Sequence, residues 1–285
     1  MPKPIIINRT IKKYNKKIKV DGDKSLSIRF ALLASQAIGK SKAYNLLKSE
    51  DVVSTINCLK KLGVKIKWDK KNNFCLINGN GLNSYVYKDN LTLNGNNSGT
   101  CVRLLTSLLI NSSKKIKIVG DKSLSKRDMK RIIDPLTEFG ATFYPKNKNT
   151  LPLYIKGSNY LTPINYLELK GSSQCKSSVM LAALLTPGET KLMCKPSRNH
   201  TELLFKYLKI PIKIKKIKNF EIIKIKGRQN FNAFNYNIPS DISSSAFFIV
   251  LTLLSKGSKL ILEKVGVNKS RTGVIEILNK MGAKI

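Results

Sequence analysis

The sequence predicts an α/β fold made of four copies of one unit, and three observations support this. Four polar clusters recur, each before a strongly apolar run: GDKSLSIR from Gly22, NNSGTCVR from Asn96, GSSQCKSS from Gly171 and PSDISSSA from Pro239. The clusters are evenly spaced, and their marker residues Ser25, Ser98, Ser173 and Ser243 lie 73, 75 and 70 residues apart. Each apolar run leads to a β-type stretch, an amphipathic helical pattern and a closing strand at 62–66, 139–143, 208–214 or 281–285. Such recurrence is typical of repeated α/β blocks.

The first helix of each copy is apolar nearly all round, at 30–33, 104–110, 179–185 and 247–254. A helix without a polar face is usually buried on every side. We therefore expect these helices to pack together inside each domain, with the sheets outside.

The second helix of each copy is amphipathic instead. In the first copy, Val52, Ile56 and Leu59 follow the i, i+4, i+7 pattern of one helix face. Short strand patterns separate the two helices, for example at 115–119 and 259–262. Each copy is therefore predicted to be a βαβαββ unit. Residues 1–20 fit none of the copies, and 215–236 form a strand-like link between copies three and four.

Composition excludes several classes of protein. The 285 residues are 42% hydrophobic, so the chain can bury a large core. No apolar run reaches the roughly 18 residues of a membrane-spanning helix, and no secretory signal is evident. The five cysteines are scattered without a CxxC pair, and His200 is the single histidine. We therefore expect a cytoplasmic protein with reduced thiols, no metal site and no cofactor.

The net charge of +35 has three interpretations that the sequence leaves open. It is compatible with nucleic-acid binding, with the coding bias of an AT-rich genome, since Lys, Asn and Ile are all abundant, or with a field that attracts an anionic substrate. The lysines are not gathered into one tail. The sequence also lacks the aromatic motifs and zinc knuckles of nucleic-acid-binding modules.

The polar clusters are predicted to lie at the N-termini of the buried helices. A helix N-terminus offers free N–H groups and partial positive charge, and nearby Lys, Arg and Ser add donors. Lys24, Ser25 and Arg29 are therefore candidates for holding a phosphate or carboxylate. The alternative is N-capping by serine alone. Two further segments, 122–131 and 197–200, occupy the starts of second helices and add basic residues.

At these motifs the chain resembles 3-phosphoshikimate 1-carboxyvinyltransferases, the EPSP synthase family. GDKSLSIR is similar to the family's lysine-serine motif, and NGNNSGTCVRLLTSLL to its GN-x-GT-x-x-R segment, with one additional Asn. Five more segments resemble family motifs in the right order: GDKSLSKRDMKRIIDPL, GSSQCKSSVMLAALL, PSRNHTELL, IPSDISSSAFF and GVNKSRTGVIEILNKMGA. The resemblance covers essentially all 285 residues.

The resemblance implies two inside-out domains of three units each. Residues 22–237 would form one complete substrate-binding domain, and residues 1–21 with 238–285 would form one unit of the second, incomplete domain. The implied reaction transfers the enolpyruvyl group of phosphoenolpyruvate to the 5-hydroxyl of shikimate 3-phosphate and releases phosphate. It belongs to the shikimate pathway, which leads to chorismate and the aromatic amino acids. Both substrates are polyanions, which suits the polar clusters.

The resemblance also implies roles for individual residues. Lys24 is the catalytic candidate and would touch both substrates. The substrate-binding candidates are Lys24, Ser25, Arg29, Asn97, Gly99, Arg127, Ser172, Ser173, Gln174 and Ser197. Asp51, Asp241 and His200 are further candidates, and the two carboxylates have an alternative structural role at helix N-termini.

The family's acidic residues for proton transfer correspond to positions beyond residue 285. We therefore expect either a shortened product with weak or no activity, or one piece of a split enzyme whose missing units come from a separate chain. Two rivals remain. One is UDP-N-acetylglucosamine enolpyruvyl transferase, which has Lys-Asn in place of Lys24-Ser25 and a catalytic loop cysteine, whereas Cys101 here falls in a predicted buried helix. The other is a non-catalytic remnant that binds nucleic acid.

Overall fold

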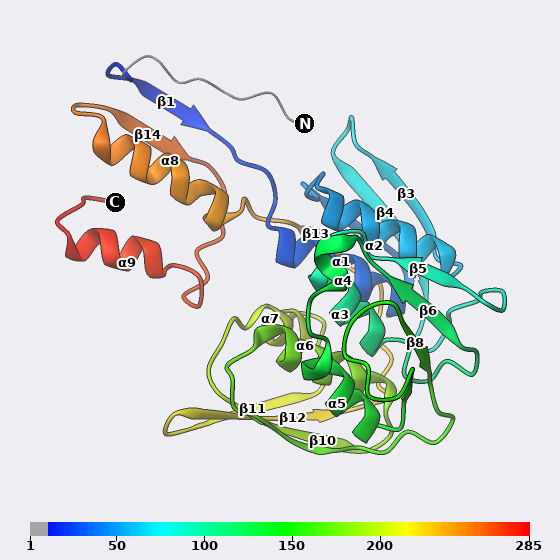
Figure 1. The fold of residues 1–285 in the computed structure, drawn as a ribbon. Coiled ribbons are helices and arrows are strands. Elements are labelled where there is room, and N and C mark those ends of the chain that lie inside the picture. Colours follow the sequence, from blue (N-terminus) through cyan, green and yellow to red (C-terminus); the bar gives the residue numbers. More distant parts are fainter. Residues whose placement is uncertain (1–10) are drawn as a thin grey trace. The chain divides into compact units, whose positions relative to one another are not determined.

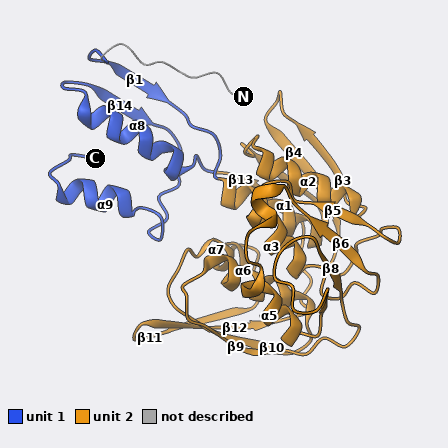
Figure 2. Cartoon of the chain, in the orientation of Figure 1, with its two compact units in different colours: residues 1–23, 239–285 blue, residues 24–238 orange. Residues whose placement is uncertain are grey.

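The computed structural model describes residues 11–285, which form two compact units. Unit 1 joins the segment that ends at Asp23 to residues 239–285, and unit 2 comprises Lys24–Ile238 (Figure 2). The chain therefore leaves unit 1, builds all of unit 2 and returns. Within the described residues, no helix is both long enough and apolar enough to cross a membrane.

The first copy lies in unit 2 and contains α1 (Lys24–Gln36), β2 (Ile38–Tyr44), α2 (Glu50–Lys61), β3 (Lys65–Asp69) and β4 (Phe74–Asn80). Its four-stranded sheet has the order β13-β2-β4-β3. The strand β13 (Asn235–Asn237) comes from the end of the unit and pairs in parallel with β2. The first strand of copy one is thus supplied by the end of unit 2. The expectation that 215–236 form only a link is wrong, because this range also contains β12 (Phe220–Lys226), which pairs within the sheet of copy three.

The second and third copies are continuous in sequence. Copy two contains β5 (Thr92–Asn94), α3 (Gly99–Ser107), β6 (Ile116–Val119), α4 (Lys122–Ser125), α5 (Lys130–Glu138), β7 (Thr142–Tyr144) and β8 (Leu153–Lys156). Copy three contains β9 (Asn165–Glu168), α6 (Ser173–Leu185), β10 (Glu189–Cys194), α7 (His200–Tyr207), β11 (Ile212–Ile217) and β12 (Phe220–Lys226). Their sheets have the orders β5-β6-β8-β7 and β9-β10-β12-β11. The predicted βαβαββ order is confirmed in both copies, with the short α4 as an addition.

The three apolar helices form the inside of unit 2. Every residue of α1 from Leu26 to Gln36 is buried, as is every residue of α6 from Cys175 to Leu185. Helix α3 packs against both α1 and α6, and the sheets lie at the periphery (Figure 1). The predicted inside-out arrangement is confirmed for this unit.

One glycine in each of the three copies of unit 2 lets the last strand in the sequence of that copy approach the first helix. A Cβ on Gly227 would overlap the carbonyl oxygens of Ala183 and Thr186, at the C-terminal end of α6. A Cβ on Gly79 or on Gly157 would likewise overlap backbone atoms at the ends of the apolar segments of copies one and two. The sheets can therefore lie close to the buried helices only because these positions lack a side chain.

Unit 1 contains β1 (Asn15–Ile18), α8 (Ile242–Leu254), β14 (Lys259–Leu262) and α9 (Gly273–Lys280). The strands β1 and β14 pair in parallel. The expectation that residues 1–20 fit no copy is therefore wrong for β1, which serves as the first strand of copy four. Local sequence could not show this, because more than 200 residues separate the two strands.

Copy four differs from the other copies in two further respects. Only Ile242, Ser245 and Ile249 of α8 are buried, whereas Phe247 is 78% and Leu254 80% exposed. The reason is that unit 1 contains no second helix of the α1, α3 or α6 kind among the described residues. Residues 281–285 also form no strand. In the other copies the closing strand pairs with a following one, as β3 does with β4, and the described part of copy four has no such partner.

Candidate anion-binding site

A polar pocket of about 360 Å³ lies within unit 2, where the starts of several helices meet. Its lining comprises Lys24, Ser25, Arg29, Asp51, Asn97, Gly99, Thr100, Arg127, Ser173, Gln174, Arg198 and His200. These residues belong to the first two turns of α1, to the first turns of α2, α3, α6 and α7, or to the segments that precede α3, α5 and α7. Each of the three copies therefore contributes the start of its first helix and the region of its second.

The pocket favours anions. Its walls carry four permanent cations, Lys24, Arg29, Arg127 and Arg198, against the single carboxylate of Asp51. With His200 neutral, the formal balance is 4 − 1 = +3. The helix starts add N–H groups and partial positive charge at the same place. A small polyanion is therefore the ligand class that this lining fits.

Lys24 begins α1 and lies opposite Asp51 in the first turn of α2. Its Nζ is 3.4 Å from Asp51 Oδ2, and the two side chains are 47% and 27% exposed. An ion pair this exposed contributes little to stability. Lys24 can therefore turn from Asp51 to an incoming anion at small cost.

Arg29 is 4% exposed and is held by hydrogen bonds to residues of three helices, α1, α6 and α7. Its Nε donates to Thr201 Oγ1 at 2.8 Å, its Nη2 to Ser177 Oγ at 2.7 Å and its Nη1 to the carbonyl of Ser25 at 3.1 Å. These contacts join α1 to α6 and α7, so the guanidinium has a defined orientation at the wall of the pocket.

Copy two contributes an amide and an arginine that hold each other. Arg127 Nη2 donates to Asn97 Oδ1 at 3.1 Å, and Asn97 Nδ2 donates to Asp121 Oδ2 at 2.6 Å. Asp121 also caps α4 by accepting from the Leu124 N–H, and this bond keeps the pKa of its carboxyl below the usual value. Gly99 leaves room here, since a Cβ would lie 3.3 Å from the guanidinium nitrogens of both Arg103 and Arg127.

Copy three contributes Gln174, whose amide is fixed on both sides. Its Oε1 accepts from Arg103 Nη1 at 2.6 Å, and its Nε2 donates to Thr100 Oγ1 at 2.9 Å. Burial, and to a smaller extent the nearby charges of Arg131 and Arg127, lower the pKa of Arg103.

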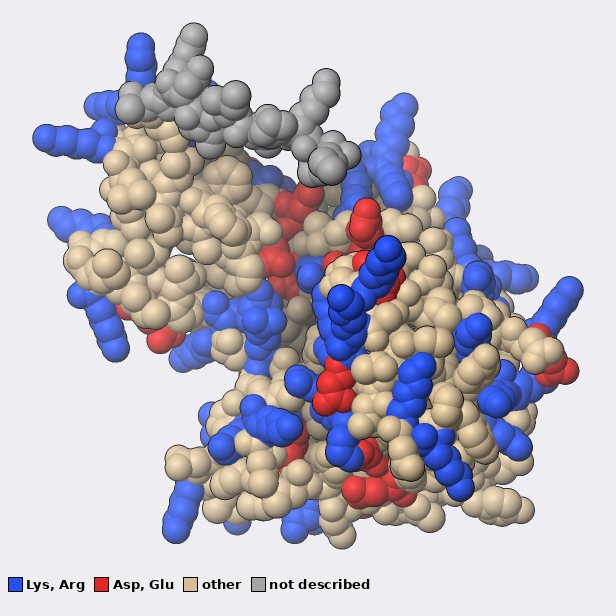
Figure 3. Space-filling view, viewed as in Figure 1, with Lys and Arg blue, Asp and Glu red and all other residues tan. Residues whose placement is uncertain are grey.

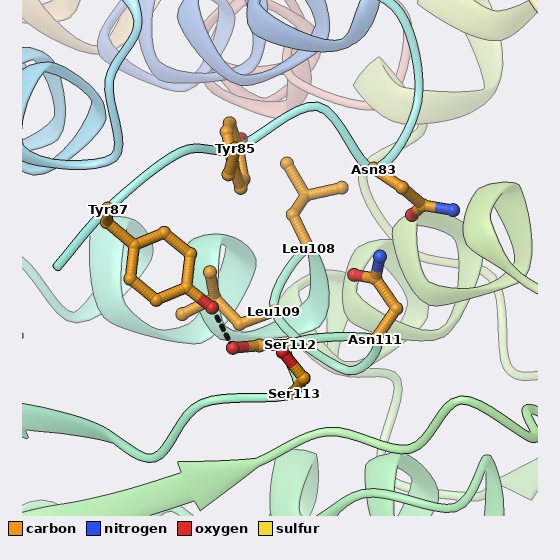
Figure 4. Close-up of a pocket in the computed structure, with 8 residues that line it drawn as sticks. All are labelled: Asn83, Tyr85, Tyr87, Leu108, Leu109, Asn111, Ser112 and Ser113. Carbon is orange, nitrogen blue, oxygen red and sulfur yellow. Dashed lines mark hydrogen bonds between the residues drawn. The ribbon is translucent and has the colours of Figure 1, made fainter. Parts of the chain in front are cut away.

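A second pocket, of about 150 Å³, has a different character (Figure 4). It is lined by Asn83, Tyr85, Tyr87, Leu108, Leu109, Asn111, Ser112 and Ser113. Tyr87 and Ser112 share a hydrogen bond, and burial raises the pKa of Tyr85 to about 12. Because no charged side chain lines it, this pocket lacks the features that select a phosphate or carboxylate.

Comparisons with known proteins show which family the chain resembles along its length. The family described as EPSP synthase (3-phosphoshikimate 1-carboxyvinyltransferase) matches residues 8–285. A 3-phosphoshikimate 1-carboxyvinyltransferase from Petrotoga mobilis is 38% identical over 275 residues, which is 95% of this chain and 62% of the relative. One from Streptococcus pyogenes is 40% identical over 270 residues, 94% of this chain and 62% of the relative.

The chain belongs to the EPSP synthase family. A solved EPSP synthase from Acinetobacter baumannii superposes with a TM-score of 0.86 at 37% identity, and the match covers 96% of this chain and 60% of that one. This chain therefore spans about 62% of the length of the curated EPSP synthases that it matches.

Most residues suggested by the EPSP synthase resemblance lie together at the pocket. Those in its lining are Lys24, Ser25, Arg29, Asp51, Asn97, Gly99, Arg127, Ser173, Gln174 and His200. Ser172 instead caps α6, where its hydroxyl accepts from the Cys175 N–H at 3.3 Å. Ser197 lies in the segment before α7, and its carbonyl accepts from Lys176 Nζ at 3.4 Å. Asp241 belongs to unit 1, where it caps α8 by accepting from the Ser243 N–H at 2.7 Å.

Sequence reasoning missed two lining residues, Thr100 and Arg198. The sequence offered a clue to both residues. Thr100 directly follows the candidate Gly99, and Arg198 directly follows the candidate Ser197. Arg103 is the last residue of the second polar cluster, but its contact with Gln174 was not predicted. That contact joins α3 to α6 and depends on the packing of the two helices.

Proposed function

We propose that this chain carries the shikimate 3-phosphate-binding part of a 3-phosphoshikimate 1-carboxyvinyltransferase. The observation that carries the proposal is the pocket of unit 2, where four cations and several helix starts face one space of about 360 Å³. Shikimate 3-phosphate, with one phosphate and one carboxylate, matches a site whose formal charge is +3. The ring hydroxyls would meet amide and hydroxyl groups such as those of Gln174 and Ser173.

The reaction proposed for the complete protein joins the 5-hydroxyl oxygen of shikimate 3-phosphate to C2 of phosphoenolpyruvate. The hydroxyl proton leaves, a proton adds to the methylene carbon, and a tetrahedral adduct forms. Loss of phosphate and of a proton from the new methyl group then restores the double bond. Lys24 is our candidate for contact with both substrates, because its ammonium group lines the pocket opposite Asp51, in a partly exposed ion pair. Asn97, Gly99 and Arg127 are our candidates for the phosphoenolpyruvate side.

The domain assignment is also part of the proposal. We take residues 22–237 as one complete three-copy domain and the remainder as one copy of a second domain. The exposed apolar side chains of α8, among them Phe247 and Leu254, would then be covered by further copies. Those copies would also supply the acid and base groups. The intact mass of the natural protein would show whether they continue this polypeptide or belong to another.

Ligand binding by the 285-residue protein tests the substrate. We expect calorimetry to detect shikimate 3-phosphate, with much weaker binding of shikimate because it lacks the phosphate. Phosphate release from the two substrates should be slow or absent, and turnover comparable to a full-length homologue would contradict our assignment of the missing groups. Failure of shikimate 3-phosphate to bind the folded protein would overturn the substrate assignment itself.

The UDP-N-acetylglucosamine enolpyruvyl transferase activity is less well supported. That reaction uses a catalytic cysteine on a loop, whereas all five cysteines of this chain are buried. Cys101 lies inside α3, where its hydrogen bond with Cys58 and its burial raise its pKa well above the usual value. Such a thiol is a poor nucleophile. Binding of the UDP-sugar in place of shikimate 3-phosphate would reverse this choice.

Nucleic-acid binding is the remaining alternative. On the face shown in Figure 3, Lys and Arg side chains are spread over many elements, with uncharged surface between them. This distribution favours a general excess of lysine over a dedicated groove. If nucleic acid were the ligand, its affinity would fall steeply with salt and would be unaffected by shikimate 3-phosphate.

A further inference from the structure

Lys176 is a buried cation for which the proposed reaction has no direct use. It lies in the second turn of α6, two residues after Gln174, and its side chain is 0% exposed. Its Nζ is 2.5 Å from Glu202 Oε1, 3.5 Å from Glu221 Oε2 and 3.4 Å from the carbonyl oxygen of Ser197. These partners belong to three other segments: the first turn of α7, the start of β12 and the loop before α7.

An apolar residue would be the simpler solution at this position. From Cys175 to Leu185 α6 is buried, and from Val179 to Leu185 it is apolar. Removing a lysine and two carboxylates from water is expensive, and buried ion pairs often stabilise a fold less than well-packed apolar side chains do. What such a group can add is a single defined arrangement of the segments that it joins.

The segment that Lys176 holds is part of the pocket wall. Ser197 and Glu202 lie at its two ends, and between them Arg198 and His200 line the pocket. The same segment contains Thr201, which accepts the hydrogen bond of Arg29 Nε. If this segment were mobile, Arg198 would lose its position in the wall directly. Arg29 would be disturbed as well, because the Thr201 hydroxyl that accepts its hydrogen bond would move.

We propose that Lys176 is a positioning residue for anion binding. By holding the Ser197 carbonyl and the Glu202 carboxylate together, it fixes residues 197–202 so that Arg198 and His200 face the pocket. Lys176 does not line the pocket itself. The inference rests on the proposed function only for the identity of the anion.

The chain offers a direct probe, because His200 is its single histidine. The imidazole signals in an NMR spectrum therefore report on residues 197–202 without assignment, and in the absence of any ligand. We would compare Lys176→Met, Lys176→Met with Glu202→Gln, and Glu202→Gln alone. The double variant removes one cation and one anion, so that the net charge of the cluster is unchanged, although Glu221 loses its contact with Lys176. Lys206→Met, on the exposed side of α7, is the matched control.

We expect the His200 signal of the ligand-free double variant to shift or broaden, and its affinity for inorganic phosphate and shikimate 3-phosphate to fall at least tenfold. Glu202→Gln alone should change the His200 signal and the anion affinities less than the double variant does, since the amide oxygen still accepts from Lys176. Should Lys176→Met fail to fold, the other two variants carry the test. A folded double variant with an unchanged His200 signal, and affinities within twofold of Lys206→Met, would overturn the proposal. If wild-type protein binds neither anion, the proposed function fails, while the His200 signal still decides whether Lys176 orders the segment.

Discussion

Placing a negative charge on Gln174 should abolish much of the anion affinity without unfolding the protein. Gln174→Glu keeps an oxygen for Arg103 Nη1, now 2.6 Å from a carboxylate, and keeps a partner for Thr100 because a hydroxyl can donate as well as accept. Gln174→Met has a similar length but loses both bonds. It leaves the Arg103 donor, whose residue is 9% exposed, without this acceptor.

The size of the pocket sets the magnitude for Gln174→Glu. A sphere of 360 Å³ has a radius of about 4.4 Å, which approximates the distance from the wall to a centred anion. Two unit charges at that distance repel by about 4 kcal/mol at an effective dielectric constant of 20 and by about 1 kcal/mol in bulk water. The affinity for a monoanion should therefore fall between about 5-fold and several hundred-fold. A doubly charged phosphate should lose more.

Two measurements check this reasoning: calorimetric affinity for shikimate 3-phosphate, and the thermal unfolding midpoint. The expected order of affinity is wild type, then Gln174→Met, then Gln174→Glu. The expected order of stability places Gln174→Glu near wild type and Gln174→Met lower by about 1–3 kcal/mol, the cost of an unsatisfied buried donor. Gln229→Glu makes the same change outside the pocket lining and controls for net charge. If Gln174→Glu weakened binding no more than Gln229→Glu, the pocket would not be the anion site.

Three further predictions concern the fold and its ionisable groups. Gly227→Ala should lower the thermal unfolding midpoint by about 3–10 °C, which corresponds to about 1–3 kcal/mol of overpacking. Gly273→Ala is the control and should change the midpoint little, because a Cβ there meets nothing within 4 Å. Equal midpoints for the two variants would contradict the close packing against α6. The Leu124 N–H depresses the pKa of Asp121 in the folded state, so this carboxylate stabilises the fold above its unfolded pKa of about 3.9, and the contribution is lost as the pH falls through the folded pKa. Asp121→Asn should therefore lose less stability than wild type when unfolding is followed from pH 6 to pH 2. Burial raises the pKa of Cys75 to about 12, so iodoacetamide at pH 8 should alkylate it much faster after unfolding in guanidinium chloride, and equal rates would show that the thiol is accessible.

The candidate site could be predicted largely because its residues lie at the starts of apolar helices. A serine, lysine or arginine next to such a helix start is visible in the local sequence, and this applies to Lys24, Ser25 and Arg29. Asn97 and Gln174 became candidates only through the resemblance to the EPSP synthase family. The contacts between copies could not be predicted in this way. That Arg29 would bind Ser177 and Thr201, or that Lys176 would join α6 to Glu202, depends on which helix faces are in contact.

Copy four shows the same limit most clearly. Its helix α8 and its strand β14 form where the repeat predicted them. Their surroundings differ from those of the other copies, because burial of a helix requires neighbours and a strand requires a partner. Hence Phe247 is exposed although it occupies an apolar run like that of α1, and residues 281–285 form no strand.

The sequence by itself determined the repeat, the order of helices and strands within it, the apolar character of the inner helices and the polar residues at their starts. These properties depend on the chemistry of residues within one turn or one strand of each other. Only the tertiary structure decided that β1 pairs with β14 and β13 with β2, so that the first strands of two copies come from segments remote from them in the chain. It also decided that the helix starts of unit 2 meet in one pocket. Pairing and convergence of this kind depend on which apolar faces pack against each other, and the periodicity of residues along the chain does not show which faces these are.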